Sequence, residues 1–250
     1  MLGRWRRDSK RRDDEPPRSH DPADGDYWRQ LPIGSSVVLR DFQALEEAHA
    51  EADGVNYEVV ARRRYQFFAA GSGDHHSVVG EYLLFDIEAA SVTHHLVTVL
   101  GAAGSGGRPE LRVYYRPDGF EPGNRATLLD AGFAWLFAEP PNLDDFVPYE
   151  LDYAPRPDVP PIDDGGEERE LDFVASGGGP RYGEVEEPGG RRIPVIAVEY
   201  RAQQEASNPL MLILEEGGLD SEGDAVPEGG FVSLFLGSQI DLTQMDVYAV

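Results

Sequence analysis

Short runs of alternating apolar and polar residues fill most of the chain and are separated by turn residues. In the first half these runs lie at residues 37–40, 56–68, 81–88, 94–101 and 111–116. In the second half they lie at residues 170–175, 192–203, 209–216, 229–237 and 245–250. Alternation with a period of two predicts strands, and short strands with tight connections predict antiparallel sheets or small barrels. The fold class is therefore predicted to be mainly β.

Helical spacing is confined to residues 41–52 and 123–137, which predict one or two short helices. Residues 139–169 carry seven prolines and an acidic excess, and predict an extended linker. Residues 1–26 are charged, with little to bury, and predict a disordered tail. The predicted order is a tail (1–26), a first β domain (27–138), the linker (139–169) and a second β domain (170–250).

The second half repeats the strand order of the first. The runs VVARRRYQ, EYLLFDIE and HHLVTVLG are followed later by VIAVEYRAQ, PLMLILEE and GGFVSLFLG. The offsets are similar: 136 residues from Val60 to Ile196, 128 from Leu84 to Leu212 and 136 from Gly101 to Gly237. The repetition suggests two small antiparallel sheet or barrel modules that arose by a diverged duplication.

The composition excludes several kinds of chemistry. Lys10 is the only lysine, so the folded part has no lysine for a phosphate-binding loop, a Schiff base or a general base. The chain has no cysteine, which excludes disulfides, thiolate metal sites and cysteine nucleophiles. No apolar run approaches the roughly 20 residues of a membrane-spanning helix, and the basic start lacks the apolar core of a signal peptide. These features predict a cytoplasmic protein.

Charge is distributed unevenly along the chain. The formal net charge is −24, yet residues 1–12 carry +5, which leaves −29 on the remainder. Such an acidic body repels nucleic acid and anionic lipid. Contact with an anionic membrane or another anionic ligand is therefore predicted only for the tail, which resembles a weak peripheral tether. Its contact residues are Leu2, Arg4, Trp5, Arg6, Arg7, Lys10, Arg11 and Arg12. The alternatives are a disordered solubilising tail, a tail that folds back on the acidic body, and a tail that binds nucleic acid.

Four of the six histidines lie in two pairs, His75 with His76 and His94 with His95. Successive side chains on a strand point to opposite faces, so each pair offers about one ligand to a metal ion. A zinc site would have to combine His75, His76 and His95 with Asp86. Nothing in the spacing requires such a site.

A hairpin of residues 81–88 and 94–101 explains the second pair without a metal. A cross-strand carboxylate lies within reach of an imidazole, which makes a favourable pair. The predicted register pairs Glu88 with Thr93, Asp86 with His95 and Leu84 with Val97.

Other motifs fail on inspection. The acidic loop at residues 220–230 lacks the glycine and glutamate that an EF-hand needs at its sixth and twelfth positions. The glycine-rich residues 101–107 lead into a strand rather than a helix, so they are not a phosphate-binding loop. No nucleophile elbow, zinc-protease motif or kinase motif is present. The sequence therefore predicts no catalytic residue and no cofactor.

The segments YEVVARRRYQ and EYLLFDIE, and later PLMLILEE and FVSLFLGSQIDLTQMDVYAV, carry a resemblance. Over about a third of its length the chain resembles bacterial small-β-barrel proteins of unknown function. Their genes often neighbour those of phage-shock-protein-A-like membrane remodellers and polyamine-synthase-like enzymes. The resemblance implies an accessory role in an envelope-stress system, peripheral to the inner membrane face. It assigns no catalytic residue.

Together the sequence predicts a non-enzymatic protein-binding or scaffold protein that uses edge strands or the aromatic linker as docking sites. The alternative is a metal-dependent enzyme that uses the region of His75, His76, His94 and His95. A protein partner is expected in the first case. The two predictions differ in whether imidazole and carboxylate groups converge on one point.

Overall fold

The computed structural model describes most of the predicted strands and few of the connections. The described residues are 21–40, 55–69, 77–89, 92–101, 107–116, 120–131, 162–163, 168–169, 173–175, 180–187, 190–202, 209–218 and 230–250. The predicted helix at residues 41–52 lies outside them. β7 (Ile162–Asp163) and β8 (Glu168–Arg169) form a separate two-stranded sheet.

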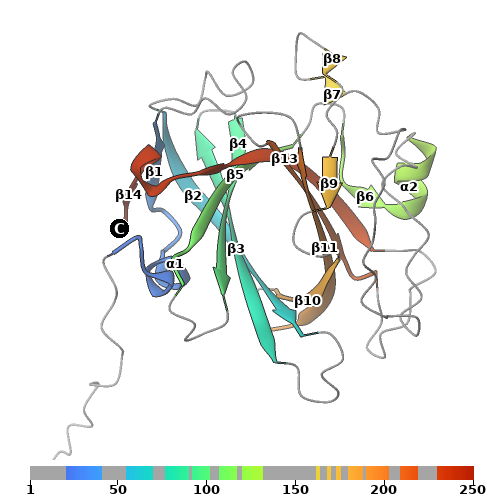
Figure 1. Cartoon of the computed structure of the whole chain (residues 1–250), viewed down its shortest axis with the longest axis horizontal. Helices are drawn as coiled ribbons and strands as arrows, with labels where there is room; N and C mark the ends of the chain where they lie inside the picture. The colour runs from blue at the N-terminus through green and yellow to red at the C-terminus, as the bar shows by residue number, and fades with distance from the viewer. Residues whose placement is uncertain are drawn as a thin grey trace, which may run out of the picture.

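Eight strands close into one antiparallel barrel (Figure 1). Each half of the chain supplies an up-and-down meander of four strands. β5 of the first meander pairs with β13 of the second, and β10 pairs with β2, so the sheet closes on itself. The first meander is β2 (Asn56–Phe68), β3 (Val78–Ala89), β4 (Val92–Gly101) and β5 (Glu110–Tyr115). The second is β10 (Arg181–Glu186), β11 (Arg192–Ala202), β12 (Pro209–Glu216) and β13 (Phe231–Ile240).

The sheet extends beyond the barrel at the start of β2. These first residues of β2 pair with β1 (Ser36–Leu39), and β1 pairs with β14 (Met245–Tyr248). The register of β2 against β3 shifts after Val59, as in a β-bulge, which reverses the faces of the side chains that follow. Val59 therefore joins the core outside the barrel, whereas Tyr65 points into it.

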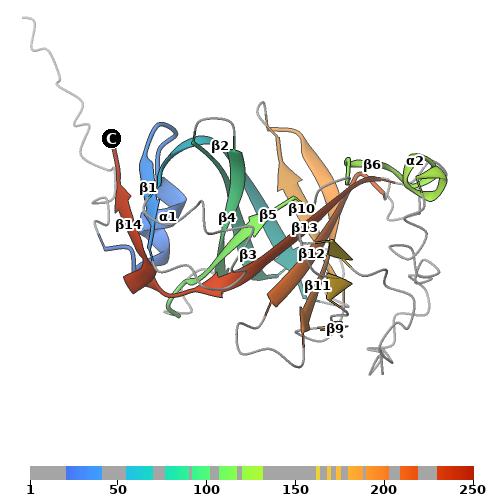
Figure 2. The ribbon, with the colours of Figure 1, turned by 90° about the horizontal axis from the view of Figure 1, so that it is seen from above.

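Short elements flank both ends of the molecule (Figure 2). α1 (Gly25–Gln30) lies beside β1 and β14, and its N-cap residue Asp24 accepts a hydrogen bond from a backbone N–H. At the opposite end, β6 (Gly123–Asn124) pairs with β13 and leads into α2 (Arg125–Asp130). Two further elements complete the described part: β9 (Phe173–Ala175), which pairs with β11, and the 3-10 helix η3 (Leu242–Gln244) before β14.

The alternation of side chains separates the core into three apolar clusters. One fills the barrel and includes Phe67, Leu84, Val97 and Phe235. The second, which we call the outer core, lies against the outer face of β3, β4 and β5 and is covered by α1, β1 and β14. Its largest member is Trp28 of α1, which is fully buried and contacts the ring of Phe85. The third lies against the outer face of β11, β12 and β13.

A glycine stands at each of the two seams where the meanders join. A Cβ on Gly183 would lie 2.0 Å from the backbone oxygen of Gln66, and one on Gly237 would lie 2.0 Å from that of Val113. Both glycines come from the second meander and sit opposite an inward-facing aromatic of the first. Gly183 pairs with Phe67, and Gly237 pairs with Tyr114. At Gly237 the ring of Tyr114 also lies within 2.7 Å of the position that a Cβ would take, whereas at Gly183 the neighbouring backbone alone fills that position.

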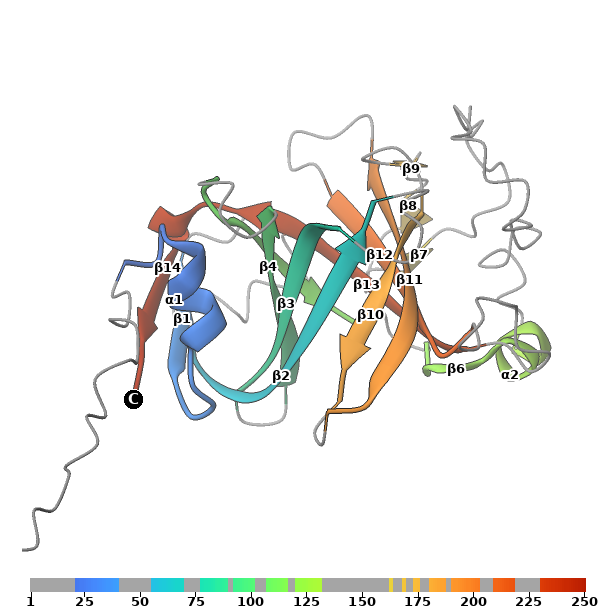
Figure 3. The same ribbon diagram turned by 90° about the horizontal axis from the view of Figure 1, so that it is seen from below.

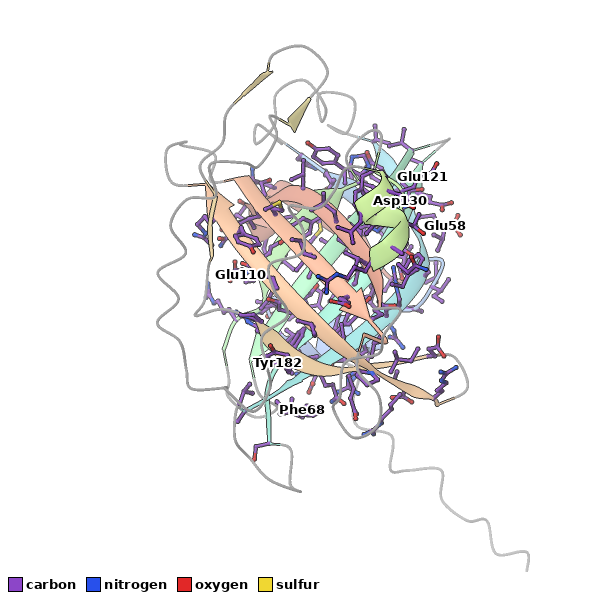
Figure 4. All side chains as sticks on the ribbon, turned by 90° about the vertical axis from the view of Figure 1, so that its right-hand side faces the viewer. Glu58, Phe68, Glu110, Glu121, Asp130 and Tyr182 are labelled. Atoms are coloured by element: carbon purple, nitrogen blue, oxygen red, sulfur yellow. The ribbon has the colours of Figure 1, made fainter. Side chains whose placement is uncertain are left out.

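The two ends of the barrel are named by residues of β2. In Figure 4 Glu58 lies towards one end and Phe68 towards the other, beside Tyr182 of β10. The antiparallel registers place the end of β3, the start of β4 and the end of β12 at the Glu58 end. They place the starts of β3, β5 and β10 at the Phe68 end.

The structure confirms a mainly β, antiparallel fold with two short helices. It differs from the prediction in how the halves are organised, because both meanders belong to one barrel. Three apolar clusters form, one inside the barrel and two on its outer face, and the one inside combines strands of both halves. Residues 21–26 belong to the folded part, since Asp24 caps α1. The predicted helix at residues 123–137 is described only from Arg125 to Asp130.

The strands that the sequence repetition matches differ by one from the strands that the barrel topology matches. The sequence offsets match β2 with β11, β3 with β12 and β4 with β13. The seams instead join first strand to first strand, β2 with β10, and last strand to last strand, β5 with β13. The sequence predicts no strand at residues 181–186, where β10 lies, so the sequence comparison is shifted by one strand.

Candidate functional site

The predicted hairpin of the second histidine pair is confirmed residue by residue. All three cross-strand pairs occur, with Asp86 opposite His95. His95 Nδ1 lies 2.7 Å from Asp86 Oδ1, inside the barrel at the Glu58 end. Burial raises the pKa of Asp86, but the hydrogen bond from His95 and the charges of His95 and Arg63 outweigh it, so the pKa is lowered. Asp86 is therefore a carboxylate, and His95 Nδ1 carries the proton that it donates.

This pair is one end of a longer network that also includes side chains of two further strands, β2 and β12. Arg63 Nη2 lies 4.0 Å from Asp86 Oδ1, and Arg63 Nη1 donates to Glu216 Oε1 at 3.3 Å. The Tyr65 hydroxyl donates to the same Glu216 oxygen at 2.6 Å. Burial raises the pKa of Tyr65, which remains a neutral donor at pH 7. We call these five residues the Glu58-end network.

The arrangement of this network favours charge pairing over metal binding. The guanidinium of Arg63 lies between the carboxylates of Asp86 and Glu216, where it satisfies both. In the part of the chain that the structure describes, no three His, Asp or Glu side chains are grouped so as to hold a metal ion. Of the predicted ligands, His95 and Asp86 are brought together, whereas His75 and His76 lie outside the described residues.

His94 points to the other face of β4, as the alternation of a strand requires. It is buried in the outer core, 4% exposed, with its ring 5.3 Å from that of Tyr57. Burial, together with the charge of His95, lowers the pKa of His94 to about 4. It is therefore neutral at pH 7. His94 therefore lies in the outer core and His95 inside the barrel, so the two histidines do not share a site.

A second network lies inside the barrel at the Phe68 end and was not foreseen from the sequence. Arg112 of β5 forms an ion pair with Glu199 of β11, and each is about 95% buried. The Tyr82 hydroxyl donates to Glu199 Oε2 at 2.9 Å and accepts from Arg181 Nη1 at 2.7 Å. Arg112 also donates to Glu110 at 3.0 Å. Burial raises the pKa of Tyr82, so it too stays neutral.

A signal for this second network exists in the sequence. Arg112 and Glu199 are single charges at inward positions of otherwise apolar strands, LRVYY and VIAVEY. A charge at such a position requires a partner, because an isolated charge is costly to bury. The sequence cannot show which partner, since Tyr82 and Glu199 are 117 residues apart. The interior therefore has a charged layer at each end and apolar residues between them.

The remaining candidate residues lie outside the described part. These are the tail residues Leu2, Arg4, Trp5, Arg6, Arg7, Lys10, Arg11 and Arg12. The acidic loop at 220–230 is described only at Gly230. None of the described helices is both long and apolar enough to cross a bilayer.

The sheet has an open edge at β14. Among the described strands, β14 pairs only with β1 (Figure 3). Arg40 N–H donates to the Gln244 carbonyl, and hydrogen-bonded pairs alternate along an antiparallel ladder. Asp246 and Tyr248 therefore bond to β1. The N–H and C=O groups of Val247 point away from β1, towards the free edge.

Exposed apolar side chains gather beside this edge. Ile33 is 60% exposed, Tyr248 57% and Val250 80%. Gly34 adopts a positive φ of 90°, and a Cβ placed there would lie 3.7 Å from Val250 Cγ2, so Val250 lies against the turn that carries Ile33. We call β14 with Ile33, Tyr248 and Val250 the edge patch. It combines apolar surface with backbone groups that pair with no other described strand.

Comparison with known proteins gives no match to a protein family, to a curated protein or to a solved structure. The resemblance to bacterial small-β-barrel proteins therefore stays a prediction.

Proposed function

We propose that this protein is a non-enzymatic protein-binding module that takes an extended segment of a partner onto the free edge of β14. Strand addition uses the backbone groups of a sheet edge for affinity and the adjacent side chains for specificity. The edge patch offers both. The observation that carries the proposal is the outward direction of the Val247 backbone groups next to exposed Ile33, Tyr248 and Val250.

The charged groups inside the barrel support a structural role for the interior. In both networks each carboxylate has a cationic or hydroxyl partner within hydrogen-bond or ion-pair distance. Buried ion pairs of this kind are retained where they fix the arrangement of a core. The docking surface is then on the outside, at the edge of β14, which pairs only with β1 among the described strands.

The test is a proline placed where it removes only the outward donor. Val247→Pro deletes an N–H that points away from β1, and edge strands tolerate proline at such a position. Val247→Thr keeps the N–H and is the matched control. We expect affinity capture from cell extract, quantified by mass spectrometry, to recover partners with the wild type and Val247→Thr but not with Val247→Pro.

Hydrogen exchange supplies a second measure on the captured complex. The Val247 amide should exchange quickly in the free protein and slowly in the complex, because the added strand accepts its hydrogen bond. A partner that binds equally to all three proteins, with no added protection at Val247, would refute strand addition.

A further inference from the structure

The chemistry of the partner segment can be specified, on the premise that β14 accepts a strand as proposed. We infer that the segment is an extended stretch of another protein in which apolar residues alternate with lysine or arginine and an aromatic residue. The inference combines the two faces of β14 with the charge of the whole chain.

On the inner face of β14, the added strand should carry apolar residues. Met245 is buried in the outer core, while Val247 packs against the same core but is only partly buried. A strand added beside β14 places alternate side chains on this face, next to Val247. An apolar residue there would complete the cover over Val247, whereas a charged residue would be desolvated without a partner.

On the outer face of β14, the added strand should carry a cation and an aromatic or aliphatic residue. Asp246 forms an ion pair with Arg40 and remains 38% exposed at its side chain. A cation opposite Asp246 makes a favourable cross-strand pair, and a carboxylate there is disfavoured. Tyr248 is two residues on, on the same face, and more than half exposed. An aromatic residue opposite it would bury apolar area.

The net charge of −24 selects between kinds of occupant. It attracts cationic segments from a distance and repels acidic ones. A second copy of this chain carries the same −24 and is disfavoured for that reason. A basic, apolar-alternating segment satisfies both faces of β14 and the charge of the body.

The probes are three short synthetic peptides with blocked ends. The first alternates valine with lysine and tyrosine, the second replaces each lysine with glutamate, and the third has the composition of the first with its valines grouped together. Each is titrated with full-length protein and followed by fluorescence anisotropy at about 0.15 M salt, where surface attraction is largely screened. We expect the first peptide to bind about tenfold more tightly than either of the others.

Variants show whether the bound peptide occupies the edge patch. Val247→Pro should weaken the first peptide about tenfold, while Val247→Thr should not. Ile33→Ser combined with Tyr248→Ser alters two exposed side chains and spares the core, so it serves if Val247→Pro fails to fold. It should weaken the peptide by a similar factor.

The outcomes separate the two proposals. If the acidic peptide binds as well as the basic one and Val247→Pro weakens both, strand addition stands and the basic partner class is overturned. If grouped and alternating peptides bind alike, or neither variant weakens binding, strand addition and the partner class both fail. If no peptide binds, the partner class is overturned. If sedimentation of the peptide-free protein shows a dimer that Val247→Pro dissociates, the occupant is a second copy and the inference is wrong.

Discussion

Replacing His94 should remove a defined part of the pH dependence of stability. The side chain is buried in the outer core and neutral, with a pKa lowered to about 4. In the unfolded chain an ordinary histidine has a pKa of about 6.5. The unfolded state therefore binds this proton more readily, and the wild type is destabilised as the pH falls below 6.5 towards 4.

The size of this effect follows from the two pKa values. One pKa unit corresponds to about 1.4 kcal/mol. A pH of 5 lies about 1.5 units below the pKa of the histidine in the unfolded chain. The wild type should therefore lose about 2 kcal/mol at pH 5 through His94 alone. A pH of 5 also lies above the isoelectric point of about 4.4, so the protein keeps a net negative charge. Phenylalanine keeps an aromatic ring against Tyr57 but cannot titrate.

The assay is urea unfolding of wild type and His94→Phe at pH 7.5 and pH 5. The wild type should lose about 2 kcal/mol more than the variant between the two pH values. His94→Gln, a polar but non-titrating replacement, should flatten the pH dependence to the same extent. Leu96→Val changes the same core without a titrating group and should keep the wild-type slope. A His94→Phe variant with the slope of the wild type would show that the histidine is not the buried neutral group described here.

Three further predictions concern the barrel. Gly237→Ala should lower the free energy of unfolding in urea by about 3 kcal/mol or more, because the added Cβ would lie 2.0 Å from a backbone oxygen. The control Gly80→Ala, whose Cβ would lie 3.6 Å from the nearest backbone oxygen, should lower it by less than about 1 kcal/mol. Equal losses in the two variants would refute the close approach at the seam. Glu199→Leu should cost about 3 kcal/mol, because it removes the buried partner of Arg112 and leaves only the partly exposed carboxylate of Glu110. Adding Arg112→Met should recover most of this loss, and no recovery would contradict the pairing. Asp86→Asn should lower the melting temperature at pH 7, because the lowered pKa of Asp86 stabilises the fold at any pH above about 3.8. This stabilisation is lost as the pH falls below about 3.8 through the folded pKa, so the difference from the wild type should shrink at pH 3. A difference that stays constant would refute the sign of the pKa shift.

The local pairing of strands could be predicted from the sequence. Alternation located β2, β3, β4, β5, β11 and β12 to within a few residues, and a short turn fixed the register that joins Asp86 to His95. That register is the part of the candidate site that sequence reasoning found. It depends only on residues close together in the chain.

The closure of the barrel and its two networks could not be predicted in the same way. Both seams join a strand of the first half to a strand of the second half. The alternation of apolar and polar residues identifies the strands but does not show which of them pair. Gly183 lies outside every strand that the sequence predicts, because glycine weakens a strand pattern, yet it stands in β10 at a seam. Arg63 and Glu216 lie on β2 and β12, and only the closed barrel brings their side chains together.

The way the two meanders are joined has a consequence for how the chain acquires its structure during synthesis. The first meander leaves the ribosome before the strands that pair with β2 and β5 at the seams have been made. β10 begins at Arg181, 113 residues after the end of β2 at Phe68, and β13 begins at Phe231, 116 residues after the end of β5 at Tyr115. Long-range pairing of this kind has a high contact order and is slow, since loop-closure entropy is lost before the contacts form. Barrel closure should therefore be the late, rate-limiting step of folding, and the half-made protein should be at its most prone to aggregation just before β10 appears.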